Sequence, residues 1–131
     1  TSIVFASDQI LVCENKIFNK PKSLNEAKKT LQELQGKKHR LILSTVAFLN
    51  GTRVWTDFSK ADLIMRSLTF KQISKYLNLE DKNVLESVGC YMLEKKGMHL
   101  FENVKGDYYT ILGFPIMKAL VFLRKQGIDI L

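Results

Sequence analysis

Residues that commonly build metal centres and disulfide frameworks are scarce in this sequence. The 131 residues include two cysteines and two histidines. Cys13 and Cys90 lie far apart and match no metal-ligand spacing, and His39 and His99 have no ligand partner at the spacing of a zinc site. We therefore expect no zinc site, and reduced thiols rather than a disulfide.

Long apolar segments are also lacking. No apolar run approaches the ~20 residues that span a bilayer. The first ten residues have no basic region followed by a cleavage site, so the sequence predicts no signal peptide. Together with the reduced thiols, this favours a cytoplasmic protein without a membrane partner.

The chain is basic, with a formal net charge of +7. Such a chain could bind nucleic acid, an anionic membrane or a phosphorylated metabolite. The basic residues are dispersed in pairs, at residues 28–29, 37–38, 95–96 and 124–125. No basic stripe is interleaved with aromatic residues, and we therefore expect no nucleic-acid partner.

The length fits one domain, and its patterns alternate between strand and helix. Capping-box spacings at Ser23 and Thr69 predict helix starts, and Asn50-Gly51 predicts a hairpin turn. We expect strands at 3–6, 10–12, 17–18, 41–49, 52–66 and 99–105, and helices at 24–35, 70–79 and 116–126. Residues 80–86 are expected to form a surface loop. In the last helix, Ile116, Leu120 and Leu123 would face the core. This order predicts an α/β domain with a mixed sheet and flanking helices.

The first candidate site lies where an early apolar run ends. Residues 3–6 indicate a short strand buried on both faces, which stops at Ser7-Asp8-Gln9. A carboxylate beyond the carboxyl end of a buried strand is a common place for chemistry in α/β proteins. A hairpin over residues 9–18 would return the chain, so that Lys20 and Asp8 could face one pocket. A carboxylate beside a cation suits a phosphorylated substrate with a divalent ion. Alternatively, Asp8 forms a turn and Lys20 is a solvated surface residue.

Four further polar residues lie outside this candidate site. Glu94 ends an apolar run, where the residues alone favour a cap before two lysines. The hydroxyls of Ser44 and Thr45 could open on a cleft or be satisfied by backbone groups. For Asp107 we favour a structural role, as a turn carboxylate that accepts backbone hydrogen bonds near Tyr109.

Five short motifs agree with one protein family. They lie at residues 6–9, 19–21, 36–39, 89–94 and 106–115, in matching order and spacing. On these motifs the chain resembles the Maf (septum formation inhibitor) family of nucleoside triphosphate pyrophosphatases. The resemblance implies an elongated α/β fold of the Maf/inosine-triphosphatase kind, with a substrate cleft between two lobes.

The resemblance also implies an activity and its residues. Family members hydrolyse nucleoside triphosphates to monophosphate and pyrophosphate with a divalent metal (Mg²⁺ or Mn²⁺), and they are associated with non-standard nucleotides and restraint of septation. By position, Asp8 corresponds to the proton acceptor and a metal ligand, Lys20 to a phosphate-contacting lysine, and Glu94 to a substrate-binding residue. Asp8-Gln9 with Glu94 is similar to the branch acting on methylated guanosine triphosphate. Residues 106–109 are more similar to the branch acting on thymidine and uridine triphosphates, and so the base stays open.

One part of the family pattern has no counterpart in the sequence. Family members begin with a strand, a Ser/Arg-rich loop that grips the triphosphate, and a glutamate that helps to hold metal. We therefore expect residues 1–131 to be a partial domain without its N-terminal phosphate-binding segment. The rival readings are a basic binding module and a non-catalytic regulator of cell division. Edge strands of the long hairpin could pair two subunits into a homodimer.

Overall fold

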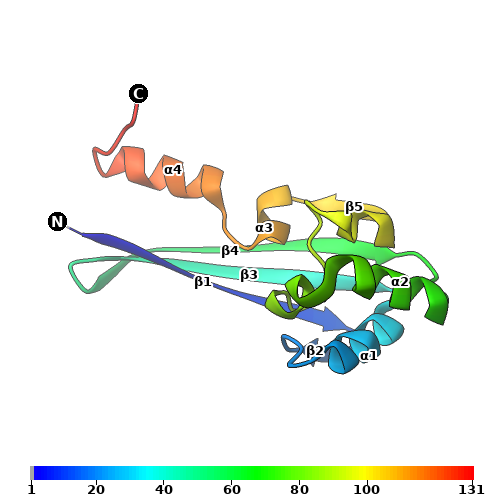
Figure 1. The fold of residues 1–131 in the computed structure, drawn as a ribbon. Coiled ribbons are helices and arrows are strands. Elements are labelled where there is room, and N and C mark those ends of the chain that lie inside the picture. The colour runs from blue at the N-terminus through cyan, green and yellow to red at the C-terminus, as the bar shows by residue number, and fades with distance from the viewer. Residues whose placement is uncertain (1) are drawn as a thin grey trace.

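The computed structural model describes residues 2–131 as a five-stranded sheet with helices along one face and beyond one end (Figure 1). The strands lie in the order β2-β1-β3-β4-β5. They are β1 (Ile3–Cys13), β2 (Lys16–Phe18), β3 (Lys38–Leu49), β4 (Thr52–Met65) and β5 (Phe101–Gly106). The helices are α1 (Leu24–Leu34), α2 (Phe70–Glu80), α3 (Tyr108–Leu112) and α4 (Ile116–Lys125), with 3-10 turns η1 (Asp81–Glu86) and η2 (Lys96–Leu100). The predicted α/β class, with flanking helices and an elongated outline, is confirmed.

The sheet was expected to mix parallel and antiparallel strands. In residues 2–131 all four strand pairs run antiparallel. The predicted Asn50-Gly51 turn joins β3 to β4, and both of its residues have positive φ. Hairpins need only such short turns, whereas parallel neighbours need a crossover connection.

Strand β1 is longer than the sequence indicates. It continues from Ile3 to Cys13 through the polar Ser7-Asp8-Gln9, so Asp8 lies within the strand and not beyond its end. The prediction of a short strand buried on both faces is therefore wrong, and Val4 is 58% exposed. Because side chains alternate along a strand, Gln9 faces the helices and Asp8 faces the other side.

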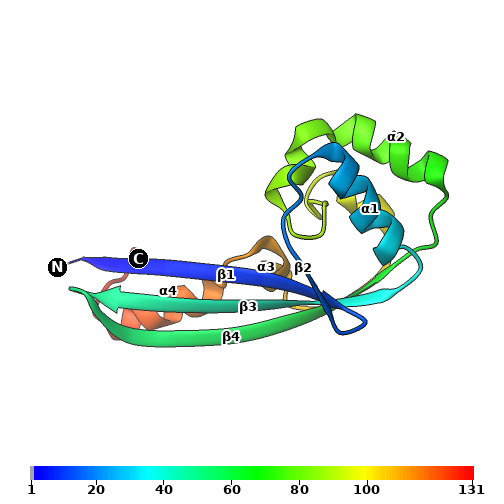
Figure 2. The same ribbon diagram turned by 90° about the horizontal axis from the view of Figure 1, so that it is seen from below.

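At the end of the sheet where β1 begins, one face is covered by α4. The Phe5 ring contacts Phe114 and Phe122 edge-on, and Phe122 stacks on Trp55 with ring centres 5.3 Å apart. The opposite face is open over β1, β3 and β4, which lie side by side in front of α3 and α4 in Figure 2. On this open face Phe58 is 64% exposed.

The helix phase of α4 differs from the prediction. Ala119 and Phe122 are buried, whereas Ile116 is exposed and Leu120 and Leu123 are half-buried. The aromatic contact between Phe122 and Trp55 sets which side of the helix meets the sheet.

The main core lies at the end of the sheet away from α4, where the helices α1 and α2 pack against the strands. It includes Leu11, Leu31, Leu41, Leu63, Ile73 and Tyr76. Both predicted helix starts are capped by a side chain, because Ser23 Oγ accepts from the Glu26 amide and Thr69 forms a full capping box. The box predicted at Ser23 is only half formed, since the Glu26 carboxylate accepts from the Lys22 amide instead. The segment expected as a surface loop is η1, and its Val84 is fully buried in the core. Within residues 2–131 no helix is long and apolar enough to cross a membrane.

Candidate functional site

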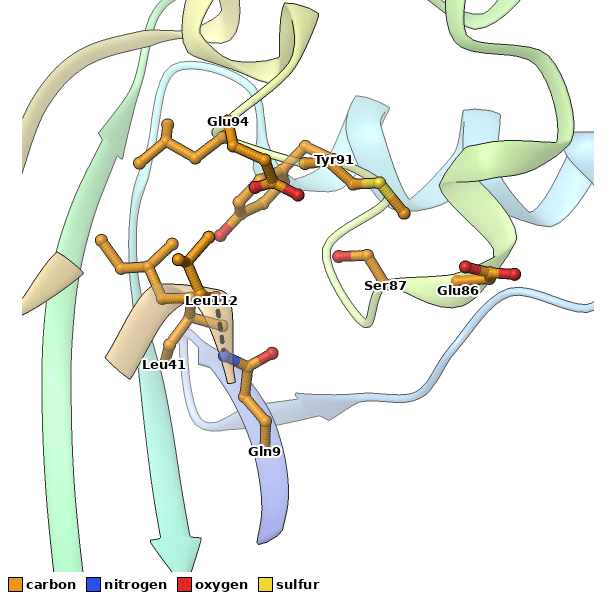
Figure 3. Close-up of a pocket in the computed structure, with 10 residues that line it drawn as sticks. Gln9, Leu41, Glu86, Ser87, Tyr91, Glu94 and Leu112 are labelled. Carbon is orange, nitrogen blue, oxygen red and sulfur yellow. Dashed lines mark hydrogen bonds between the residues drawn. The ribbon is translucent and has the colours of Figure 1, made fainter. Parts of the chain in front are cut away.

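A small polar cavity lies between the covered side of β1, the helix α3 and the segment 86–94 (Figure 3). Its volume is about 120 Å³. Pockets that enclose a whole small ligand measure roughly 300–1,000 Å³, so this cavity suits one ring system and not an entire nucleotide. It is lined by Gln9, Leu41, Glu86, Ser87, Tyr91, Met92, Leu93, Glu94, Ile111 and Leu112.

Gln9 is held firmly at the floor of the cavity. Its Nε2 donates to the carbonyl oxygens of Thr110 and Ile111, at 2.8 and 3.0 Å. Both amide protons are therefore used, and the Oε1 atom is left as an acceptor that turns into the cavity in Figure 3. The carbonyls are in place because Asp107 Oδ1 caps α3 by accepting from the Tyr109 amide at 2.9 Å. This confirms the structural role predicted for Asp107.

Glu94 forms the opposite side of the cavity and also borders a neighbouring groove beside β5. Its carboxylate points inward from the segment 86–94 in Figure 3. The chain turns sharply after it, because the amides of Lys95 and Gly97 both donate to the Met92 carbonyl oxygen. The cavity thus presents a carboxylate and an amide oxygen to a ligand that donates hydrogen bonds.

Asp8 and Lys20 do not line this cavity. Asp8 pairs in register with Ser44 on the open face of the sheet, and its carboxylate makes no hydrogen bond or ion pair within residues 2–131. Lys20 is exposed in the link between β2 and α1. The structure therefore brings Gln9 and Glu94 together on one side of β1, and it places Asp8 on the other side. The roles of Asp8, Lys20 and Glu94 stay predictions.

The two adjacent hydroxyls of β3 have different environments. Thr45 is fully buried and shares a 2.9 Å hydrogen bond with Ser7 Oγ of the neighbouring strand β1. Ser44 is exposed on the open face, beside Asp8. Of these two hydroxyls, that of Ser44 is therefore the one available to a ligand on the open face.

Sequence reasoning missed a buried polar pair behind the cavity. His39 of β3 is 1% exposed and Tyr91 is 4% exposed, and His39 Nε2 lies 2.7 Å from the Tyr91 hydroxyl. Burial lowers the pKa of His39 to about 4, so the imidazole is neutral at pH 7. Burial also raises the pKa of Tyr91 well above its usual value. The partners are far apart in the sequence, and no local pattern joins them.

A divalent metal would have few protein ligands here. Within the described residues no three His, Cys, Asp or Glu side chains are grouped to hold an ion. Mg²⁺ is often held by one or two carboxylates together with waters and substrate phosphates. The uncommitted carboxylate of Asp8 on the open face fits that mode of binding.

The antiparallel sheet, its covered face and the small cavity lined by acceptors define an α/β protein with a candidate site on one side of β1. Residues 1–126 match the family described as Maf-like protein. The chain belongs to this family. It is 40% identical over 125 residues to a nucleoside triphosphate pyrophosphatase of Granulibacter bethesdensis, covering 95% of the chain and 64% of the relative.

Other relatives carry a narrower name. A 7-methyl-GTP pyrophosphatase of Bartonella quintana is 41% identical over 127 residues, which covers 97% of the chain and 64% of the relative. A 7-methyl-GTP pyrophosphatase of Rhizobium etli is 40% identical over 126 residues, covering 96% and 63%. The chain thus spans less than two thirds of the length of these curated relatives.

Proposed function

We propose that the full-length protein hydrolyses a nucleoside triphosphate to the nucleoside monophosphate and pyrophosphate. The observation that carries this proposal is the meeting of Gln9 and Glu94, from two separate Maf motifs, in one cavity of a Maf-like fold. Relatives named as pyrophosphatases at about 40% identity support it.

We propose further that the cavity receives the nucleobase and prefers a methylated guanine. Glu94 and the Gln9 Oε1 atom are acceptors, and a guanine edge offers two adjacent kinds of N–H donor. Methylation at the N7 position adds positive charge to the ring, which a carboxylate attracts. A pyrimidine with a single N–H would satisfy this acceptor pair less well. The names of two of the relatives agree with this choice.

The phosphates would lie on the other side of β1, at Asp8. The outer edge of β1 pairs with β2 only at residues 11–13, so residues 3–10 have an unpaired edge within the described chain. In this proposal, a nucleotide whose base occupies the cavity would cross this edge to bring its phosphates to the open face.

In this arrangement the charged residues act on the attacking water and on the phosphates. Asp8 would orient or deprotonate the water that attacks the α-phosphorus, or hold the metal that acidifies it, and Lys20 would place a positive charge on a phosphate. A divalent metal bound at Asp8 would neutralise phosphate charge and acidify water. Preorganised charges of this kind stabilise the transition state because they need no rearrangement during the reaction.

The test is pyrophosphate release by the full-length protein with Mg²⁺ or Mn²⁺, over canonical triphosphates, pseudouridine triphosphate and 7-methylguanosine triphosphate. Asp8→Asn should remove most turnover without loss of folding, since Asp8 is exposed and has no partner in residues 2–131. Asp129→Asn, at an exposed carboxylate near the C-terminus, is the matched control and should retain turnover. Near-normal rates in Asp8→Asn would refute the role of Asp8.

If the folded full-length protein released no pyrophosphate from any triphosphate in the panel, the proposed hydrolase activity would be refuted and a non-catalytic regulator favoured. The proposed role in septum restraint rests on the family resemblance. It predicts that overproduction of the full-length protein elongates dividing cells. Normal cell length would contradict it.

A further inference from the structure

The hydrogen bond between His39 and Tyr91 links the sheet to the segment that carries Glu94. His39 lies in β3, and Tyr91 lies three residues before Glu94 in the segment 86–94. The Tyr91 ring packs edge-on against Phe101 of β5, with centres 4.7 Å apart. The ring is thus fixed from two sides, by a hydrogen bond and by an aromatic contact.

The backbone around Tyr91 is shaped to allow this position. Gly89 lies directly against the ring, and a Cβ at that position would overlap it. Cys90 adopts a left-handed conformation with φ of 62°, and its carbonyl oxygen accepts from the Tyr76 hydroxyl at 3.3 Å. A non-glycine residue in this region costs energy unless surrounding contacts hold it. The turn before Glu94 is therefore imposed by its contacts and is not a relaxed loop.

Stability alone does not explain a polar pair at this place. His39 Nδ1 is buried without a hydrogen-bond partner within residues 2–131. An unsatisfied buried polar atom costs roughly 1–3 kcal/mol, and replacing both members of such a pair by apolar groups can be neutral or stabilising. Two apolar side chains would fill the same space. The hydrogen bond differs from an apolar contact in being directional, and it therefore fixes the position of the Tyr91 hydroxyl group.

We propose that Tyr91, held by His39, is a positioning residue that sets the place of Glu94 and thereby the choice of nucleobase. This inference rests on the proposed function, and it concerns the part of the site that discriminates among substrates. Tyr91 lines the cavity on the same segment as Glu94, so a shift of its ring moves the acceptor that the base would meet. The reaction centre at Asp8 lies on the other face of β1 and would be unaffected.

The test compares Tyr91→Phe with the double variant Tyr91→Phe/His39→Leu in the full-length protein. The single variant leaves the His39 ring without any partner, whereas the double variant removes both polar groups. We expect the double variant to recover wild-type stability in urea. Its KM for 7-methylguanosine triphosphate should nevertheless rise about tenfold with kcat within about twofold of wild type, and its preference over uridine triphosphate should fall. Tyr109→Phe, which removes a hydroxyl from α3, is the control and should change neither constant.

A second measurement tests this inference independently of the proposed pyrophosphatase activity. Amide hydrogen exchange in residues 91–95 should be faster in both Tyr91 variants than in wild type, even where global stability is recovered. If wild type releases no pyrophosphate, the proposed function fails and the exchange rates alone decide the positioning role. A double variant with wild-type KM, base preference and exchange rates would overturn the inference, because the pair would then be structural only.

Discussion

Acidification should destabilise this protein through His39. The pKa of this buried histidine is about 4 in the folded state, against 6.5 for an unperturbed side chain. Between these values the unfolded chain binds a proton that the folded protein excludes, so stability falls as the pH drops from 6.5 towards 4. At about 1.36 kcal/mol for each pH step, the loss from His39 is about 3 kcal/mol. Above pH 6.5 the contribution is constant.

Urea unfolding at intervals from pH 7.5 to pH 4 measures this loss. Carboxylates contribute mainly at the acidic end of this range: the pKa of Asp62, for example, is lowered from 3.8 mainly by a hydrogen bond from Arg40, so its stabilising contribution is lost only as the pH falls towards and below 4. The double variant Tyr91→Phe/His39→Leu retains these carboxylates and lacks the histidine, so the difference between its profile and that of wild type isolates His39. Parallel profiles across the whole range would refute the assignment of a neutral buried His39.

Two substitutions test the packing and capping described above. Gly89→Ala should lower the free energy of unfolding by about 1–3 kcal/mol, because the added methyl group must displace a Tyr91 ring held by His39 and Phe101. A stability equal to wild type in urea would show that the ring has room to move. Thr69→Ala should cost about 0.5–2 kcal/mol by removing the capping box of α2, and an unchanged thermal midpoint would contradict that contribution.

Short-range sequence signals correctly predicted the starts of two helices, one hairpin turn and one further cap. The hydroxyls of Ser23 and Thr69 cap helices at the expected positions, and Asn50-Gly51 makes the expected hairpin. Asp107 also caps α3 in the expected role. In each case the partner lies within three residues in the sequence. Short-range spacing therefore contains most of the information that these features require.

The site could be predicted only in part, because its geometry depends on partners far away in the sequence. Ser7-Asp8-Gln9 resembles a strand end, but Ser7 bonds to Thr45 and Gln9 bonds to carbonyls of α3. These contacts satisfy the polar side chains inside a continuing strand. The family resemblance pointed to Asp8 and Glu94 without indicating that β1 would separate them. The link between His39 and Tyr91 had no sequence signal at all.

The placement of Asp8 and Gln9 on opposite faces of β1 has a consequence for the lengths that this strand can tolerate. Its pairing with β3 continues without a bulge from Ile3 to Val12. Removing or inserting one residue before position 8 would either shift the register or exchange the faces on which the two side chains lie. A single substitution on the open face leaves the strand register and the face of each side chain unchanged. A single-residue deletion or insertion would instead turn the carboxylate towards the helices and the amide towards the open face, so β1 should accept changes of residue far more readily than changes of length.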